Sequence, residues 1–354
     1  MTTILHDWFL TEGGAERVVR EVMQMYPDAH LVAAYGSTPE YYGRPVTYGP
    51  RNRFHPLLKK LGLDRPAACL DFSRIQLPPD PELVISDGHT ATLWSRVPNG
   101  IPWLHYCHTP SRFLWRPDLL SPGTGSRLVW SALRPLMLHE DKRHAQRPNT
   151  IVSNSRTTAR RVMEFYARES EVVHPPVDTD FFRPPVTGSV DGYFLVVGRL
   201  EHYRRYQDVI RAASAIKMPL VVVGDGGAAS DLRAQFQSSL VTFLGRVPDD
   251  KLRELYGGAL ALVVPNEEDF CMVAVEAMAC GTPVVGLNRG GVSETVEDGV
   301  TGILFQSSTW SEIGDSMREV DRIRWNREEI RGRALAYSRA EFREKMAAAV
   351  RAIS

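Results

Sequence analysis

The chain lacks an excess of charge of either sign, a long apolar run and a paired set of cysteines. Its 42 Lys and Arg balance 42 Asp and Glu, and this zero net charge argues against a dedicated nucleic-acid binder. No apolar run reaches the roughly 18 residues that a membrane span needs, and the first residues lack a charged-then-apolar secretory signal. The four cysteines have no paired spacing, as expected of reduced thiols in a cytoplasmic protein.

The sequence has the composition of a globular protein with more than one domain. It contains 354 residues, of which 43% are hydrophobic and 24% charged. Short β-branched runs alternate with helical patterns, which is typical of parallel sheets covered on both faces. We predict helices at Ala15–Met25, Arg156–Tyr166 and Ala340–Ile353. We predict strands at Thr3–His6, His30–Ala34, Leu83–Ser86, Trp103–Cys107, Thr150–Asn154, Tyr193–Val197, Leu220–Val223, Val241–Leu244, Leu260–Val264, Val284–Gly286 and Gly302–Phe305.

A proline-rich segment divides the chain in two. Residues 173–185 contain too many prolines for a regular element and are predicted to be a linker. The linker separates a domain at 1–172 from a domain at 186–335, and a final helical segment occupies 336–354. Two doubly wound α/β domains would form a cleft between the carboxyl ends of their sheets, where ligands bind in such folds.

The most informative segment runs from Glu268 to Glu276 and continues to Gly281 and Pro283. It places one carboxylate in a loop and a second, eight positions later, inside a short helix. The first N–H groups of a helix favour anions. Carboxylates beside that site suit a neutral group rich in hydroxyls instead. A ligand with phosphates and hydroxyl-bearing rings fits both, which predicts a nucleotide sugar.

This arrangement resembles the E-x7-E signature of the retaining glycosyltransferases of family 4. The resemblance implies the GT-B fold, with two Rossmann-like domains facing each other across a cleft. It assigns sugar hydroxyls to Glu268 and the ribose to Glu276. Asp269 and Cys271 replace glycines of the common family form, and Cys271 lies where the sugar would approach the backbone. The donor-binding residues expected on this segment are Phe270, Cys271, Met272, Val273 and Glu276.

A second motif, Gly198-Arg199-Leu-Glu-His-Tyr-Arg204-Arg205, follows a predicted strand. Fixed cations stabilise the charge that grows on a leaving diphosphate, and the Arg fork binds phosphate oxygens bidentately. The motif resembles the family's G-R-L-x-x-x-K-G, which assigns the phosphates to Arg199 and Arg204. Arg204 stands in place of the family's Lys, and Arg205 in place of its Gly. Surface arginines on a first turn are the alternative interpretation.

Three further turns carry weaker signals. Gly13 and Gly14 precede a predicted helix, and the resemblance places this loop over the diphosphate. Val247 lies in a segment that resembles the family's contact with the nucleobase. The turn Gly224-Asp-Gly226 either approaches the ligand or is simply a tight turn.

The run His105-Tyr-Cys107-His108 has the residue types of a metal site. Along a strand these side chains point alternately to opposite faces, so they cannot converge on one ion. By resemblance His108 faces the reacting sugar, where it would donate a hydrogen bond or assist proton transfer. Asp178-Thr-Asp180 is predicted to be a turn and capping device. We therefore expect neither a metal nor another cofactor.

Three segments mix cations with apolar side chains: Arg51–Leu61, Arg112–Arg116 and Arg127–Leu138. Such segments can lie on an anionic bilayer, which would place the protein at the inner face of the plasma membrane. Buried helices with arginines that extend to solvent are the alternative. Both interpretations stay open.

The motifs His6-Asp-Trp, Gly13-Gly14-Ala-Glu and Glu267-Glu-Asp-Phe are similar to those of bacterial mannosyltransferases of surface-polysaccharide assembly. This resemblance implies retaining transfer of a hexose, foremost mannose from GDP-mannose, to a lipid-linked or oligosaccharide acceptor. A UDP-hexose is the second candidate donor. A nucleotide-sugar epimerase or a non-catalytic nucleotide-sugar-binding protein would also fit a chain of this architecture. The expected catalytic residues are His108, Arg199, Arg204 and Glu268.

Overall fold

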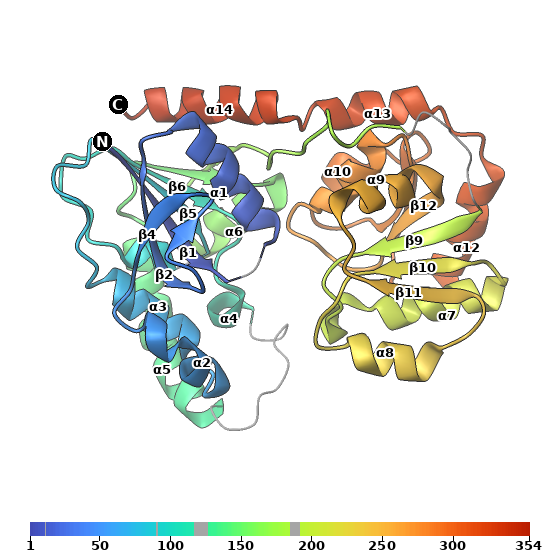
Figure 1. The fold of residues 1–354 in the computed structure, drawn as a ribbon, viewed down its shortest axis with the longest axis horizontal. Helices are drawn as coiled ribbons and strands as arrows, with labels where there is room; N and C mark the ends of the chain where they lie inside the picture. Colours follow the sequence, from blue (N-terminus) through green and yellow to red (C-terminus); the bar gives the residue numbers. More distant parts are fainter. Residues whose placement is uncertain (11, 90, 117–126, 185–191) are drawn as a thin grey trace. The chain divides into compact units, whose positions relative to one another are not determined.

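The computed structural model describes residues 1–354 apart from 11, 90, 117–126 and 185–191 (Figure 1). The described residues form two compact units, one of Met1–Pro176 with Phe342–Ser354 and one of Val177–Glu341. Each unit has a predominantly parallel central sheet between two hydrophobic clusters. The predicted architecture of two doubly wound, Rossmann-like α/β domains is therefore confirmed.

The first unit contains an eight-stranded sheet in the order β3-β4-β2-β1-β5-β6-β7-β8. Only the short β3 runs antiparallel to its neighbour among these strands. The strands are β1 Thr2–Phe9, β2 His30–Gly36, β3 Glu40–Tyr41, β4 Arg44–Tyr48, β5 Leu83–Gly88, β6 Trp103–Cys107, β7 Thr150–Ser153 and β8 Glu171–Val172. The α-helices that precede the second unit are α1 Gly14–Met25, α2 His55–Lys60, α3 Asp64–Phe72, α4 Arg112–Trp115, α5 Arg127–His144 and α6 Arg156–Tyr166.

The last helix, α14 (Arg339–Arg351), contributes to the core of the first unit. Its buried side chains, among them Phe342 and Met346, belong to the same hydrophobic cluster as α1 and β1. The ring of Phe342 meets Tyr106 edge to face at 5.9 Å. The Arg343 guanidinium pairs with the buried carboxylate of Glu21 on α1. Residues at the end of the chain thus complete the core of a unit that begins at its start (Figure 1).

The second unit contains a six-stranded parallel sheet in the order β11-β10-β9-β12-β13-β14. Its strands are β9 Tyr193–Val197, β10 Leu220–Val223, β11 Val241–Gly245, β12 Ala259–Val264, β13 Val284–Leu287 and β14 Gly302–Phe305. Its α-helices are α7 Tyr206–Ile216, α8 Ala229–Phe236, α9 Asp249–Gly258, α10 Met272–Ala279, α11 Val292–Thr295, α12 Trp310–Arg322 and α13 Arg327–Leu335.

Strand order defines one switch point in each sheet. The chain winds in one direction from β1 to β2 and in the other from β5 to β6, so the first switch lies between β1 and β5. The second lies between β9 and β12 for the same reason. Crevices that bind ligands open at the carboxyl ends of the strands at such points. The residues that follow these four strands are therefore the first candidates for a site.

The three basic and apolar segments are placed differently. Phe54, Leu57 and Leu61, in and beside α2, are 47%, 55% and 53% exposed. By contrast, α4 packs inward: Leu114 is buried, and the Trp115 indole donates to Asp141 Oδ2 at 2.7 Å. The side chains of residues 127–133 lie outside the described residues. Within the described part of the chain, no helix combines the length and the apolar character needed to cross a bilayer.

Candidate functional site

The switch point of the first unit brings together two imidazoles and a carboxylate. His6 in β1 is in register with Asp87 in β5, and His108 directly follows β6. His6 Nδ1 lies 2.8 Å from Asp87 Oδ1. His108 Nε2 lies 3.0 Å from both carboxylate oxygens of Asp87. The predicted residue His108 is thus oriented by a carboxylate that the sequence reasoning missed.

Charge is concentrated in this buried cluster. Burial lowers the pKa of His6, but the hydrogen bond with Asp87 and the negative charges of Asp87 and Glu16 outweigh it and raise the pKa to about 10. Burial raises the pKa of Asp87, yet His108 and His6 hold it below its usual range. His6 is therefore a cation, and Asp87 an anion, at neutral pH. With Nε2–H of His108 donating to Asp87, its Nδ1 is the nitrogen left for another partner.

A second carboxylate from β1 shapes the loop after β5. Asp7 Oδ2 accepts a hydrogen bond from the backbone N–H of His89 at 2.8 Å and lies 3.2 Å from its Nδ1. A Cβ at Gly88 would lie 2.8 Å from the Asp7 carboxylate carbon, so this position requires glycine. The neighbouring strand ends are therefore closely packed. The His89 and His108 rings stand 5.7 Å apart between centroids.

The side chains of β6 alternate as predicted. His105 Nδ1 is 2.9 Å from Ser86 Oγ, and burial lowers the pKa of His105 to about 4. Tyr106, on the opposite face, donates to the carbonyl of Val173 at 2.8 Å. His105 and His108 thus have different partners. Among the described residues, no group of three His, Cys, Asp or Glu side chains is placed to hold a metal ion.

The paired glycines of the first unit lie at the start of α1. Gly13 is its N-cap and Gly14 its first residue. A Cβ at Gly13 would approach Glu16 Oε2 to 2.9 Å. Glu16 is buried in the first turn, and its Oε1 lies 3.7 Å from His6 Nε2. A side chain at Gly13 would therefore collide with the helix's own acid, Glu16, which lies beside His6.

The switch point of the second unit holds the predicted Arg and Glu together. Glu268 lies in the loop after β12, and Arg204 ends a short 3-10 turn after β9. Arg204 Nη1 donates to Glu268 Oε1, which also accepts a hydrogen bond from Asn266 Nδ2 at 2.9 Å. Burial lowers the pKa of Arg204, but the negative charge of Glu268 outweighs burial and raises the pKa above its usual value. The guanidinium is therefore permanently cationic. Tyr206, whose pKa burial raises to about 12, packs beside this pair.

The structure separates the roles of Arg204 and Arg205. Arg205 has a φ of +58°, in the left-handed region that glycine prefers, and its Nε pairs with Asp208 at 3.0 Å. It therefore caps α7 rather than joining Glu268. Arg199 is exposed just after β9, and its side chain makes no hydrogen bond or ion pair with the described residues. Its guanidinium is the open positive charge at this strand end.

Two glycines fix the loop that carries Glu268. The Glu268 carbonyl accepts a hydrogen bond from Gly291 N–H at 2.8 Å, and Glu268 forms a bridge with Gly290. Gly290 has a φ of +69°, and a Cβ at Gly291 would lie 2.2 Å from the backbone of Phe270. The downstream Gly-Gly pair thus serves the close packing of this loop. Phe270 is itself buried, with 3% of its surface exposed.

Helix α10 begins where the donor was predicted to approach. Its N-cap, Cys271, has a φ of +76°, and the first N–H bond of the helix runs from Ala274 to the Cys271 carbonyl. The N–H groups of Met272 and Val273 precede that bond, and such groups attract anions. Burial raises the pKa of the Cys271 thiol, so it is neutral.

Glu276 lies in α10, as predicted, but the residue is only 1% exposed. Tyr256 of α9 donates its hydroxyl to Glu276 Oε2 at 2.8 Å. The carboxylate is therefore held rigidly by a partner that the sequence reasoning did not include. A buried carboxylate with a fixed orientation can accept a further hydrogen bond only at the lone pairs that its present partners do not use.

Two of the remaining predicted turns, at Gly224 and Val247, lie at the same edge of the sheet. Val247 is half-buried between β11 and α9. Gly224 has a φ of +130°, and a Cβ there would lie 1.9 Å from the Gly198 carbonyl oxygen. The Gly224 turn is thus needed for backbone packing against β9. Asp178 accepts from the N–H of Phe181 at 3.1 Å, which is the predicted capping turn.

Sequence profiles match both halves of the chain. Residues 12–181 match Glycosyltransferase Family 4, and residues 179–334 match Glycosyl transferases group 1. The chain combines these two glycosyltransferase domains. The suspected resemblance to family 4 is therefore confirmed at the level of the family.

Curated glycosyltransferases match part of this chain. The D-inositol 3-phosphate glycosyltransferase of Acidothermus cellulolyticus is 30% identical over 243 residues, covering 58% of this chain and 51% of the relative. The Mycobacterium bovis enzyme of the same name is 29% identical, covering 63% of this chain and 50% of the relative. The chain thus spans about half the length of these curated relatives.

Solved glycosyltransferase structures share the fold over the whole length. Sucrose-phosphate synthase from Thermosynechococcus elongatus superposes with a TM-score of 0.77 and 17% identity, covering 99% of this chain and 98% of that one. Anabaena HepE in complex with UDP and glucose has a TM-score of 0.71 and 18% identity, covering 98% of each chain. The fold is GT-B.

Proposed function

We propose that this protein is a retaining glycosyltransferase that moves a hexose from a nucleoside diphosphate sugar to a glycan or lipid-linked acceptor. The observation that carries the proposal is the arrangement at the β9–β12 switch point. A permanently charged Arg204, an exposed Arg199 and the carboxylate of Glu268 lie at adjacent strand ends. Cations for phosphates next to an acid for hydroxyls fit a nucleotide sugar.

In this proposal the two arginines bind the diphosphate. The guanidinium of Arg204 carries five N–H donors, so it can keep its contact with Glu268 and still bind a phosphate oxygen. Arg199 approaches from solvent. Because negative charge grows on the diphosphate as the glycosidic bond breaks, both cations lower the barrier of the chemical step.

Glu268 is proposed to orient the hexose. Its Oε1 is occupied by Arg204 and Asn266, so Oε2 is the oxygen that remains for sugar hydroxyls. A carboxylate already bound by a cation is a poor nucleophile. We therefore infer that the leaving diphosphate takes the proton of the acceptor on the same face of the sugar, with retention at the anomeric carbon. No step uses a metal.

His108 is proposed to bind a sugar hydroxyl through Nδ1. Asp87 holds Nε2 at 3.0 Å and thereby fixes both the ring orientation and the tautomer. Glu276, held by Tyr256, is the proposed partner of the ribose, and the first N–H groups of α10 are proposed to face the phosphates. Gly13, Gly14 and Val247 complete the proposed donor contacts.

The first donor we propose is GDP-mannose, which follows from the N-terminal motifs and the Glu267-Glu-Asp-Phe segment. A UDP-hexose is the second candidate, favoured by the UDP and glucose in the HepE structure. The test is release of GDP or UDP from a panel of donors with bacterial lipid-linked oligosaccharides as acceptors. We expect an α-linked product from an α-linked donor. The one-bond C1–H1 coupling constant of the product, measured by NMR, reports this anomeric configuration.

Two outcomes of this assay would overturn the proposal. Free epimerised sugar without transfer would identify an epimerase. Tight donor binding with neither hydrolysis nor transfer would identify a nucleotide-sugar-binding protein. A β-linked product would contradict retention alone, while leaving the transferase activity in place.

The exposed part of the first unit supports one further element of the proposal, association with an anionic bilayer. Phe54, Leu57 and Leu61 expose apolar side chains beside Lys59 and Lys60. Apolar side chains flanked by cations suit an anionic membrane surface. Binding to vesicles should rise with anionic lipid, fall with salt and weaken in Leu57→Asn. Equal binding to neutral vesicles would contradict this element.

A further inference from the structure

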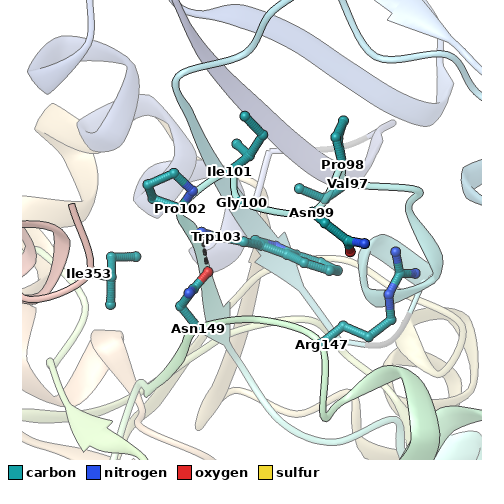
Figure 2. A pocket seen from close by; sticks show the side chains of 10 residues that line it. All are labelled: Val97, Pro98, Asn99, Gly100, Ile101, Pro102, Trp103, Arg147, Asn149 and Ile353. Atoms are coloured by element: carbon teal, nitrogen blue, oxygen red, sulfur yellow. Dashed lines mark hydrogen bonds between the residues drawn. The ribbon is translucent and has the colours of Figure 1, made fainter.

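A groove lies at the edge of the first unit's sheet opposite to His108. Trp103 begins β6 and Asn149 immediately precedes β7, so both lie at the amino-end edge of the sheet, and the His108 cluster lies at the opposite edge. Figure 2 shows the cavity around them, which has a volume of about 300 Å³. This groove is separate from the site proposed above.

Three adjoining cavities make up the groove. The cavity at Trp103 shares Arg147 with one of about 440 Å³ and shares Pro98 and Ile101 with another of about 520 Å³. The last two share Arg96. Common lining residues show that the cavities adjoin one another. Each cavity by itself is large enough to take a ligand group well beyond the size of water.

Positive charge dominates the described lining of this groove. Arginine side chains come from several elements, while only two carboxylates line it. The arginines are Arg74, Arg96, Arg143 and Arg147, and the acids are Asp80 and Glu140. Glu140 is already paired with Arg143. In a chain with no net charge, this excess makes the groove a local exception.

The groove is built around a fixed arginine. Arg147 Nη1 donates to the Ser95 carbonyl at 2.8 Å, and its guanidinium carbon lies 5.5 Å from the Trp103 ring centre. Asn149 Oδ1 accepts from the Trp103 N–H at 2.9 Å, which fixes the start of β6 (Figure 2). Arg96, Arg143 and Arg147 all line the 440 Å³ cavity. Burial lowers the pKa of Arg147, and the charges of Arg143 and Arg96 lower it further. Cations held in mutual repulsion gain when an anion binds between them.

We propose that this groove is a second binding site, which takes a phosphate group through Arg96, Arg143 and Arg147. Planar guanidinium groups from different elements match the several oxygens of a phosphate, and Arg binds them bidentately. The phosphate comes either from a small soluble ester or from a lipid headgroup. Both sources share the chemistry that the groove recognises.

Trp94 provides a reporter for this site. Its ring lines the 440 Å³ cavity and stacks on His144 with centroids 4.7 Å apart. Its indole N–H has no hydrogen-bond partner among the described residues. In ¹⁵N-labelled full-length protein, the Trp94 indole signal is assigned by its loss in Trp94→Phe. Inorganic phosphate is then titrated at constant ionic strength, with chloride as the reference.

The test variant is Arg96→Gln with Arg143→Gln, because both side chains are exposed and Arg147 is left to hold the loop. The control is Arg318→Gln, since Arg318 pairs with Asp315 three residues earlier, as Arg143 pairs with Glu140. We expect the Trp94 signal to shift until phosphate saturates the site. The phosphate affinity from this titration should fall at least about tenfold in the test variant and stay unchanged in the control. A linear shift, or one that persists in the test variant, overturns the proposal.

A second titration distinguishes the two sources of phosphate. Dihexanoyl phosphatidylglycerol is added below the concentration at which it forms micelles. A tighter, Arg-dependent response than with inorganic phosphate identifies a lipid headgroup site. A weaker response identifies a site for soluble phosphate esters. A response to neither probe contradicts the proposal in both forms.

Discussion

The two switch points of this molecule use opposite charge designs. In the first unit, Asp87 accepts hydrogen bonds from two imidazoles, and the cationic His6 is buried. In the second unit, Glu268 pairs with one guanidinium, while Arg199 at the neighbouring strand end stays exposed and unpaired among the described residues. One cluster is internally neutralised and closed, whereas the second retains an open positive charge.

This difference indicates that the first cluster positions His108 and stabilises the fold, whereas the second cluster is the one available to bind a negatively charged ligand. The buried carboxylate of Asp87 fixes the orientation of His108. The cation of this cluster, His6, is buried and already paired with Asp87, so it is not available to bind an anion. An exposed arginine beside a paired one is ready for a diphosphate. Mutations should therefore affect stability most in the first cluster and catalysis most in the second. The predictions below run from the largest expected effect to the smallest.

The largest effect on stability is expected for Asp87→Asn. Removing one charge of a buried, hydrogen-bonded set costs about 3–5 kcal/mol of unfolding free energy, because the remaining charge loses its partner. Urea unfolding measures this loss, and NMR should show that the pKa of His6 falls. Asp250→Asn, which removes an exposed acid, is the control. A loss below about 1 kcal/mol would show that the cluster is not coupled as described.

The largest effect on catalysis is expected for Arg204→Gln, with Arg205→Gln as its matched neighbour. Removing a donor aimed at developing charge costs about 10²–10³ in kcat. Arg205, which pairs with Asp208, should tolerate the change within a few-fold. Steady-state kinetics with a saturating donor makes the comparison. Equal losses in the two variants would contradict the assignment of Arg204.

Stability should fall as the pH rises from about 6.5 to about 10. His6 has an ordinary pKa of 6.5 and a folded-state pKa of about 10, so its contribution is complete below 6.5 and is lost as pH approaches 10. The expected loss is on the order of a few kcal/mol. Urea unfolding at a series of pH values measures it, and His6→Gln should flatten the curve. An unchanged slope in that variant would refute the cationic His6.

The smallest effect concerns the strained N-cap of α10. At a φ of +76°, Cys271→Gly should be more stable than Cys271→Ala by about 0.5–1 kcal/mol, because only glycine is unstrained there. The control is Ala274→Gly in the same helix, which should destabilise by about 1 kcal/mol. The three variants are compared by their melting temperatures. A more stable Ala variant at position 271 would argue against strain.

Local patterns were sufficient for much of the fold. The strands Trp103–Cys107, Tyr193–Val197 and Gly302–Phe305 and the helix Arg156–Tyr166 have the predicted bounds. Buried parallel strands are continuous apolar runs, which makes them easy to recognise. The short antiparallel pair Glu40–Tyr41 and Arg44–Tyr48 was not predicted, because the first strand has only two residues and the second, Arg-Pro-Val-Thr-Tyr, is not an apolar run.

The site was predicted in part, for a physical reason. Glu268 and Arg204 belong to motifs that are visible in the sequence, and the structure brings them together. Asp87 and Asn266 were missed because their importance depends on the strand order, which no local pattern encodes. One signal was available: Asp87 directly follows the predicted strand Leu83–Ser86, as a residue near a carboxyl edge would.

The central claim is that Arg199 and Arg204 bind the diphosphate of a nucleotide sugar, and calorimetric titration tests it most directly. GDP, UDP, GMP and UMP are each titrated separately into two proteins. One is the wild type, and the other is the double variant Arg199→Gln with Arg204→Gln. The account predicts that a diphosphate binds at least about tenfold more tightly than its monophosphate, and that the double variant loses this preference. Equal affinity for both in the wild type, or an undiminished preference in the variant, would contradict it.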